Sequence, residues 1–124
     1  MSIRNIASAK LPEMVLHRRH MHMHPEVSFK EKETYKFILD KLTQHPELNI
    51  REHVGKNDDN EGAGIVASIG EGRPHIAVRA DFDALPIEDQ KEVPYKSQNP
   101  GAMHACGHDG HTSTLLGLVD AVVA

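Results

Sequence analysis

The 124-residue sequence has little cysteine, no excess of positive charge and no long apolar run. Its one cysteine cannot form an internal disulfide, so the fold does not depend on an oxidising compartment. With 18 acidic and 14 basic side chains, it lacks the basic face that neutralises phosphates, which disfavours nucleic acid as a partner. Its apolar runs are far shorter than the roughly 20 residues of a membrane span, and residues 1–13 do not resemble a secretory signal. We therefore expect a cytoplasmic protein with no membrane partner.

Two helices are predicted in the first third of the chain. The first is expected to have its N-cap at Ser8, to carry Pro12 in its first turn and to stop before Pro25. The second is predicted by the spacing of Ser28 and Glu31, which is typical of a capping box. Apolar residues recur at helical spacing in both segments, so each helix should present one apolar face.

Short apolar runs predict strands over residues 63–70 and 74–81, both buried, and a less regular strand over residues 49–54. The proline-rich stretch 85–100 is expected to be a loop, and an apolar helix is expected over residues 111–124. A helix followed by strands without a tight hairpin signal favours the α/β class. Because the last helix is still strongly apolar at the final residue, we infer the front part of a longer domain.

Residues 101–112, GAMHACGHDGHT, concentrate metal-ligating side chains. Cys106 and His108 are separated by one glycine, and in an extended segment such positions point to the same side, so a thiolate and an imidazole can share one metal. The alternative is that the cysteine is buried and packs as a small hydrophobe. The histidines and glycines around it favour the metal. The other candidates in this segment are His104, His111 and Asp109, and Asp109 is placed either to cap the following helix or to orient an imidazole.

Two carboxylates follow the predicted strand over residues 74–81. In open α/β sheets, ligands gather at the carboxyl ends of strands, so Asp81 and Asp83 are placed either to bind a metal or to fix a ligating histidine. The alternative is that they pair with Arg79 or cap the turn before Pro86. The sequence does not decide between these interpretations.

A third group of histidines lies in HRRHMHMHPE, residues 17–26. His20 and His24 are one helical turn apart, as a helical metal site requires. No acidic residue shares their spacing. This favours a polar helix end that runs into a turn.

The segments HMHPEVSFKEKET, VRADFDALPI and MHACGHDGHTSTLLG occur in this order. Together they resemble the amidohydrolase branch of the zinc-dependent exopeptidase superfamily, which includes hippurate hydrolase and N-acyl-amino-acid amidohydrolases. The resemblance runs from about Leu16 to the end of the chain. It implies that residues 1–124 are the N-terminal portion of a three-layer α/β catalytic domain, with the rest of that domain and a lid domain absent.

The resemblance also implies an activity, namely hydrolysis of the amide bond of N-acyl amino acids by divalent metal ions, with two ions in a complete site. By position, Cys106 and His108 correspond to metal ligands and Asp81 to a supporting acid beside the metals. Zinc, manganese, cobalt or nickel would suit these ligands. The family's general-base glutamate has no counterpart in this sequence, so the chain alone is expected to be inactive. The competing hypothesis is a non-catalytic His/Cys metal-binding module, and a homo-oligomer is compatible with both.

Overall fold

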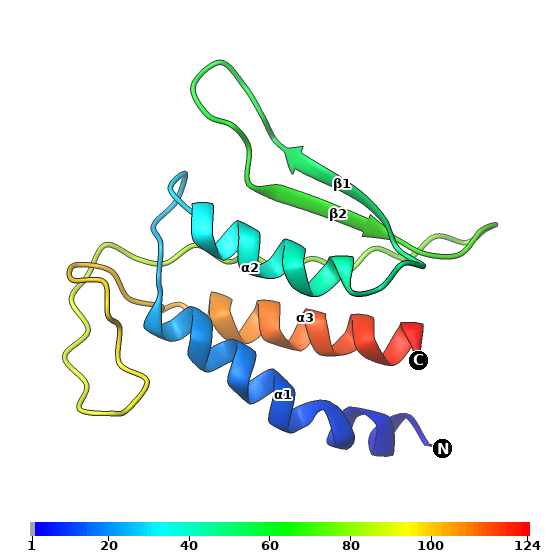
Figure 1. Ribbon diagram of the computed structural model, residues 1–124, viewed down its shortest axis with the longest axis horizontal. Coiled ribbons are helices and arrows are strands. Elements are labelled where there is room, and N and C mark those ends of the chain that lie inside the picture. Colours follow the sequence, from blue (N-terminus) through cyan, green and yellow to red (C-terminus); the bar gives the residue numbers. More distant parts are fainter. Residues whose placement is uncertain (1) are drawn as a thin grey trace.

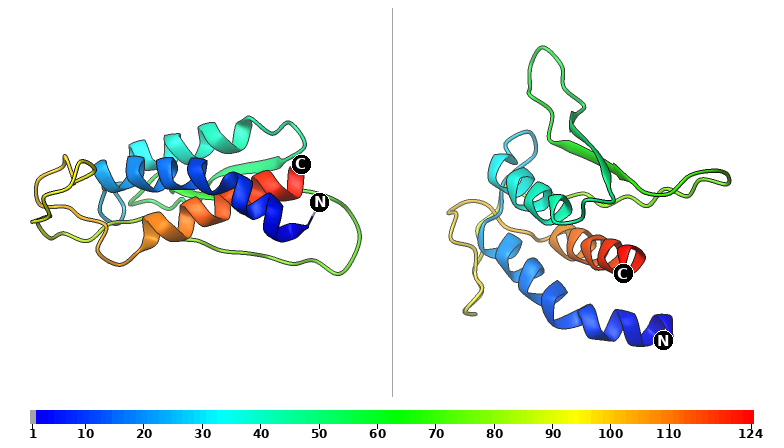
Figure 2. Two further views of the ribbon diagram at one scale, coloured as in Figure 1. Left: turned by 90° about the horizontal axis from the view of Figure 1, so that it is seen from below. Right: turned by 45° about the vertical axis from the view of Figure 1, so that its right-hand side comes forward.

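The computed structural model describes residues 2–124, which form three helices and a two-stranded sheet. The helix α3 lies between α1 and α2, and the sheet covers α2 on the side away from α3 (Figure 1). The views in Figure 2 show the yellow loop of the proline-rich stretch at one end of this arrangement and the green segment that follows β2 at the other. The elements are α1 (Ile3–Met23), α2 (Lys32–Thr43), β1 (Asn49–Val54), β2 (Gly64–Ser68) and α3 (His108–Val123).

The first helix begins earlier than predicted. The hydroxyl of Ser2, not Ser8, caps α1 by accepting a hydrogen bond from the backbone N–H of Asn5 at 3.2 Å. Nothing between these two serines stops a helix, so the upstream cap extends it and Pro12 lies in the helix interior. The predicted stop before Pro25 is confirmed, since α1 ends at Met23.

The second helix is confirmed, but its capping box is wrong. Glu31 occupies the N-cap position of α2 and makes no side-chain capping bond. The carboxylate of Glu26 caps the helix instead, accepting from the backbone N–H of Glu33 at 3.2 Å and of Thr34 at 2.6 Å. An acid outside the helix therefore satisfies its free N–H groups and suits the positive end of the helix dipole. Ser28 is left free to bind elsewhere.

The strands predicted over residues 49–54 and 63–70 are confirmed as β1 and β2, but the predicted burial of the second is wrong, because every residue of β2 is partly or largely exposed. They pair antiparallel, with Asn49 opposite Ser68, and the register shifts before Val54 meets Gly64. A Cβ atom at Gly64 would lie 2.7 Å from the carbonyl oxygen of Val54. Glycine is therefore required at this position, because a side chain there would collide with the neighbouring strand.

The buried strand predicted over residues 74–81 is wrong. The segment has no strand partner within residues 2–124, and Ile76 is 88% exposed. Its apolar, β-branched composition favours burial, but a strand also needs a neighbouring backbone, and β2 ends at Ser68 without pairing to it. The loop predicted over residues 85–100 is confirmed, for it contains no helix or strand.

A small apolar core joins α2 to α3. Ile38 and Leu42 of α2 and Leu116 of α3 are buried together, and side chains of the sheet pack against them. The helix predicted over residues 111–124 is confirmed and begins three residues earlier, at His108. The mixture of helices and sheet agrees with the predicted α/β class. In the described part of the chain, no helix is both long enough and apolar enough to span a bilayer.

Candidate metal centre

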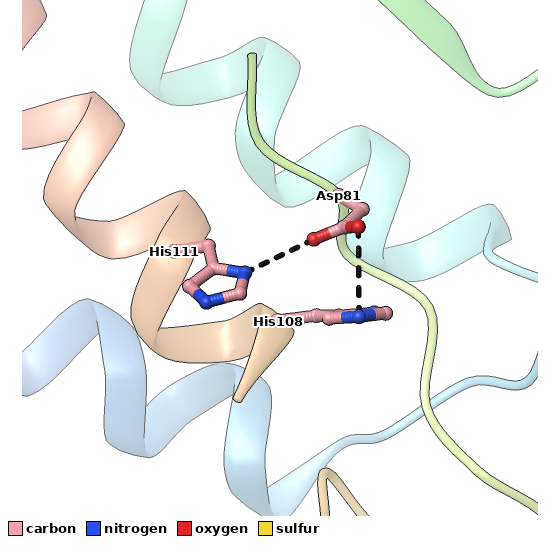
Figure 3. A group of neighbouring side chains, drawn as sticks. All are labelled: Asp81, His108 and His111. Carbon is pink, nitrogen blue, oxygen red and sulfur yellow. Dashed lines mark hydrogen bonds and ion pairs between the residues drawn. The ribbon is translucent and has the colours of Figure 1, made fainter. Parts of the chain in front are cut away.

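Three potential metal ligands meet where the extended segment 74–81 reaches the start of α3 (Figure 3). Asp81 ends that segment, and His108 and His111 lie in the first turn of the helix. One ligand atom from each residue lies within 4.8 Å of the others. The carboxylate of Asp81 is 3.2 Å from Nδ1 of His111 and 3.5 Å from Nε2 of His108. The group therefore combines a carboxylate with two imidazoles.

Local backbone geometry places these donors. Gly107, immediately before α3, has a φ of +91°, a left-handed conformation that glycine adopts without steric cost. The turn brings His108 into the first turn of the helix, and His111 follows on the same face. The hydroxyl of Thr112 donates to the backbone carbonyl of Asp81 at 2.7 Å, which fixes the extended segment against α3.

The second nitrogen of His108 is also bound. Its Nδ1 lies 2.8 Å from a carboxylate oxygen of Asp83 and 2.9 Å from the carbonyl oxygen of the same residue. Both are acceptors, so Nδ1 carries a proton and donates to Asp83, while Nε2 faces the carboxylate of Asp81. This is the contact expected if Asp83 fixes a histidine, one of the two roles that the sequence left open.

Both carboxylates are held in the charged form. For Asp83, the hydrogen bond from Ser28 is the main cause that lowers the pKa below its ordinary value, against partial burial, and the bond from His108 adds to it. For Asp81, burial acts to raise the pKa, but the hydrogen bond from His111 and nearby positive charge outweigh it and leave the pKa lowered. Both groups are therefore ionised at neutral pH, so Asp81 is charged as a cation ligand must be and Asp83 can accept the hydrogen bond from His108.

Cys106 does not join the three converging donors. The residue is an exposed free thiol in the turn before α3, so packing as a buried small hydrophobe is wrong. The extended geometry assumed for Cys106 and His108 is also wrong, because the left-handed Gly107 turns the chain between them. The pair of Asp81 with Arg79 exists at 3.6 Å, but that guanidinium is largely exposed and contributes little. A metal role for Cys106 stays a prediction.

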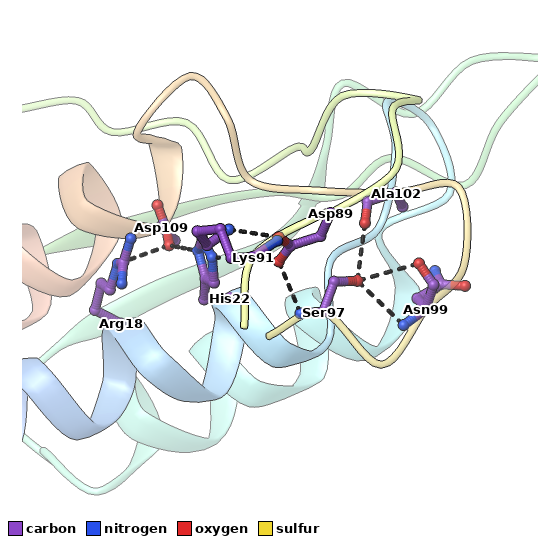
Figure 4. Close-up of polar contacts among 8 residues, drawn as sticks. All are labelled: Arg18, His22, Asp89, Lys91, Ser97, Asn99, Ala102 and Asp109. Atoms are coloured by element: carbon purple, nitrogen blue, oxygen red, sulfur yellow. Dashed lines mark hydrogen bonds and ion pairs between the residues drawn. The ribbon is translucent and has the colours of Figure 1, made fainter. Parts of the chain in front are cut away.

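Asp109 binds a histidine far away in the sequence. Its Oδ2 accepts hydrogen bonds from Nδ1 of His22 at 2.8 Å and from Nε of Arg18 at 2.9 Å (Figure 4). Its Oδ1 accepts from the N–H of Gly110. The sequence left open whether Asp109 caps the helix or orients an imidazole. It orients His22 of α1, and it is itself buried. The residue next to His108 thus ties α3 to α1.

The same imidazole faces a second buried acid, Asp89, in the loop before the metal-ligand segment. Nε2 of His22 lies 3.8 Å from the carboxylate of Asp89, which accepts from Nζ of Lys91 at 2.7 Å and from the backbone N–H of Ser97 at 2.9 Å (Figure 4). The bond to Lys91 is the main cause that holds the pKa of Asp89 far below its ordinary value. Residues 89–97 are thereby fastened beside α1.

The histidines of residues 17–26 do not gather around one point. The rings of His20 and His24 are 4.8 Å apart, and both side chains are exposed, with His20 stacked on Phe37. No third donor joins this pair within residues 2–124. His104 is buried, and neither of its ring nitrogens has a hydrogen-bond partner in the described chain. These residues stay outside the candidate centre.

Comparison with known proteins identifies the segment that carries the centre. Residues 77–124, which include Asp81, His108 and His111, match peptidase family M20/M25/M40. Over 106 residues the chain is 53% identical to YhaA of Bacillus subtilis (strain 168), which is provisionally named an amidohydrolase. The chain is related to the M20 amidohydrolases. It is also 38% identical over 117 residues to an N-acyl-L-amino acid amidohydrolase of Geobacillus stearothermophilus.

A solved M20 structure has the same fold. The YXEP protein of Bacillus subtilis, described as a dinuclear metal-binding peptidase of the M20 family, matches with a TM-score of 0.78 and 35% identity over 98% of this chain and 32% of that one. The two curated relatives are matched over 84% and 93% of this chain, but over 25% and 30% of their own lengths. The predicted resemblance and α/β fold are confirmed, and the chain spans between a quarter and a third of these M20 relatives.

Proposed function

We propose that the chain supplies metal-binding residues to a hydrolase that cleaves the amide bond of N-acyl amino acids. The observation that carries this proposal is the convergence of Asp81, His108 and His111, with the second nitrogen of His108 held by Asp83. A carboxylate–histidine arrangement of this kind is typical of metal ligands in proteins. The N-acyl-L-amino acid amidohydrolase among the relatives supports the substrate class, and the dinuclear neighbour supports divalent metal.

The residues fit a divalent cation. We expect Nε2 of His108, the carboxylate of Asp81 and the Cys106 thiolate to hold it, with His111 as a further donor from the same turn. Such a mixed set of nitrogen, oxygen and sulfur suits zinc, while manganese, cobalt or nickel can replace it, and we expect two ions in the complete site. When bound, such an ion lowers the pKa of a water molecule and polarises the carbonyl of the substrate.

The chain's own groups prepare the site for that chemistry. Asp83 keeps the proton of His108 on Nδ1, so its Nε2 is available as a ligand. Asp81 stays ionised between two imidazoles and provides negative charge for a cation. The converging group holds no glutamate that could act as a general base. We therefore expect the isolated 124-residue chain to bind metal weakly and to hydrolyse no N-acyl amino acid.

Substitution of His108 in the full-length gene product tests the proposal. We expect His108→Ala to lose bound metal, measured by elemental analysis, and to lower kcat/KM for acetyl- and benzoyl-amino acids by about 100-fold or more. His24→Ala is the matched control, because His24 is exposed and outside the centre. Unchanged metal content and turnover in His108→Ala would refute the proposal. Metal loss without any hydrolysis in the parent protein would favour the binding module instead.

A further inference from the structure

The hydroxyl of Ser28 reaches the carboxylate behind the candidate ligand. Ser28 lies between α1 and α2, and its Oγ donates to Oδ2 of Asp83 at 2.6 Å. The other carboxylate oxygen, Oδ1, is the one bound to Nδ1 of His108. A hydrogen bond from a hydroxyl to a charged carboxylate at this distance is among the stronger kinds. The Asp83 carboxylate is thus held at both oxygens, by Ser28 on one side and His108 on the other.

The backbone around Ser28 is fixed against the Asp83 segment. The carbonyl of Glu26 accepts from the N–H of Ala84 at 2.8 Å, and Val27 forms a parallel bridge with Ala84. Because the Glu26 side chain also caps α2, this short connection is held at both ends. The placement of the Ser28 hydroxyl beside Asp83 therefore follows from several contacts.

The residue after Ser28 has an unusual conformation. Phe29 has a φ of +67°, although it has a bulky side chain and that side chain is 80% exposed. A left-handed conformation is unfavourable for such a residue and persists only where surrounding contacts impose it. Burial of the phenyl ring does not offset that cost in the described chain. The N–H of Lys30 donates to the carbonyl of Val27 at 3.0 Å and closes this turn, and the contacts of Glu26 and Val27 with Ala84 fix the turn against the Asp83 segment.

We propose that Ser28 is a positioning residue for the metal ligand His108, acting through the Asp83 carboxylate. This inference rests on the proposed function. The Asp83 side chain is 30% exposed, so without the hydroxyl its carboxylate can turn toward water. Nδ1 of His108 would then keep only the backbone carbonyl as acceptor. The tautomer with the proton on Nε2, in which that nitrogen cannot bind a cation, would become more populated.

The competing interpretation is that the carbonyl of Asp83, 2.9 Å from Nδ1, holds the imidazole alone. Three variants separate the two. Ser28→Ala removes the hydroxyl, Ser28→Thr keeps it, and Ser68→Ala removes an exposed serine hydroxyl on β2 whose bond, to the carbonyl of Asn49, is 3.5 Å long. All are compared in the full-length gene product. The readouts are the ¹⁵N shifts of the His108 ring in the metal-free protein and the zinc Kd from chelator competition.

We expect the parent protein, Ser28→Thr and Ser68→Ala to keep the Nδ1–H tautomer and the same zinc Kd. In Ser28→Ala, the ring nitrogens should report a mixture of tautomers, and zinc should bind about 3- to 10-fold more weakly, less than the 10- to 100-fold typical of direct neighbours of ligands. Unchanged tautomer and Kd in Ser28→Ala, beside weakened zinc binding in His108→Ala, would refute the inference alone. Zinc binding that is unaffected by His108→Ala would refute the proposed function and the metal role of Ser28 with it.

Discussion

Removal of the Asp109 carboxylate tests whether α1 holds α3 through a buried charge. This carboxylate accepts three hydrogen bonds, from His22, Arg18 and Gly110. The two side-chain donors differ in what they can do once the acceptor is gone. The Arg18 side chain is 37% exposed and can turn to water, whereas the His22 side chain is 2% exposed and cannot.

The expected cost follows from that difference. A buried donor without an acceptor costs about 1–3 kcal/mol, so His22 accounts for most of the effect. Loss of the charge-assisted bond from Arg18 adds less because water replaces it. We expect Asp109→Ala to lower the free energy of unfolding by about 3 kcal/mol, the lower end of what breaking a buried ion pair costs. Asp109→Asn keeps one acceptor oxygen and should cost about half as much.

Urea unfolding followed by circular dichroism measures this change. The midpoint should fall in Asp109→Ala while the slope stays constant, since the surface exposed on unfolding does not change. Asp58→Ala, in the exposed loop between β1 and β2, is the matched control and should stay within about 0.5 kcal/mol of the parent protein. A loss below about 1 kcal/mol in Asp109→Ala would show that the buried carboxylate does not hold the helices together.

Two further predictions concern the same packing. The bond to Lys91 lowers the folded-state pKa of Asp89, so this carboxylate should stabilise the fold fully above its unfolded-state pKa of about 3.9 and lose that effect as the pH falls further. In Asp89→Asn, the free energy of unfolding, measured by urea unfolding at successive pH values, should therefore fall less steeply at acid pH than in the parent protein. An equally steep fall in both proteins would contradict this. A Cβ atom at Gly117 would lie 2.5 Å from the sulfur of Met14, so Gly117→Ala should lower the Tm despite a helix-propensity gain of about 1 kcal/mol, and Met14→Ala should relieve the clash. A higher Tm in Gly117→Ala alone would contradict it.

Local patterns predicted the elements well where one signal dominates. The apolar spacing of α2 and the β-branched residues of β2 each have a simple local explanation. Capping was less predictable, because Ser2 and Ser8 offer the same hydroxyl and only the upstream one is used. For α2, the cap is the side chain of Glu26, which lies two residues before the predicted capping residue Ser28. Short-range sequence patterns do not show which of several suitable side chains makes the capping hydrogen bond at a helix end.

Long-range contacts were the part that the sequence could not supply. The strand predicted over residues 74–81 failed because an apolar pattern reports a preference for burial and carries no information about a pairing partner. The contact of His22 with Asp109 joins residues 87 positions apart, and that of His108 with Asp83 joins residues 25 apart. Residue types suggested that acids would fix histidines, but only the fold shows which acid meets which histidine.

His111 belongs to the converging group of potential metal ligands and Cys106 does not, and one local feature of the backbone causes this difference. Positions i and i+2 share a side only in an extended backbone, and the left-handed Gly107 ends that geometry between Cys106 and His108. Beyond Gly107 the chain is helical, so the partner of His108 along the chain is three residues on, at His111. Cys106 and His108 therefore lie on either side of a turn, and an ion that both of them bind has to lie where this turn brings their side chains together. Asp81, bound to α3 through Thr112, is thereby fixed beside His108 and His111, whereas Cys106 lies before the turn.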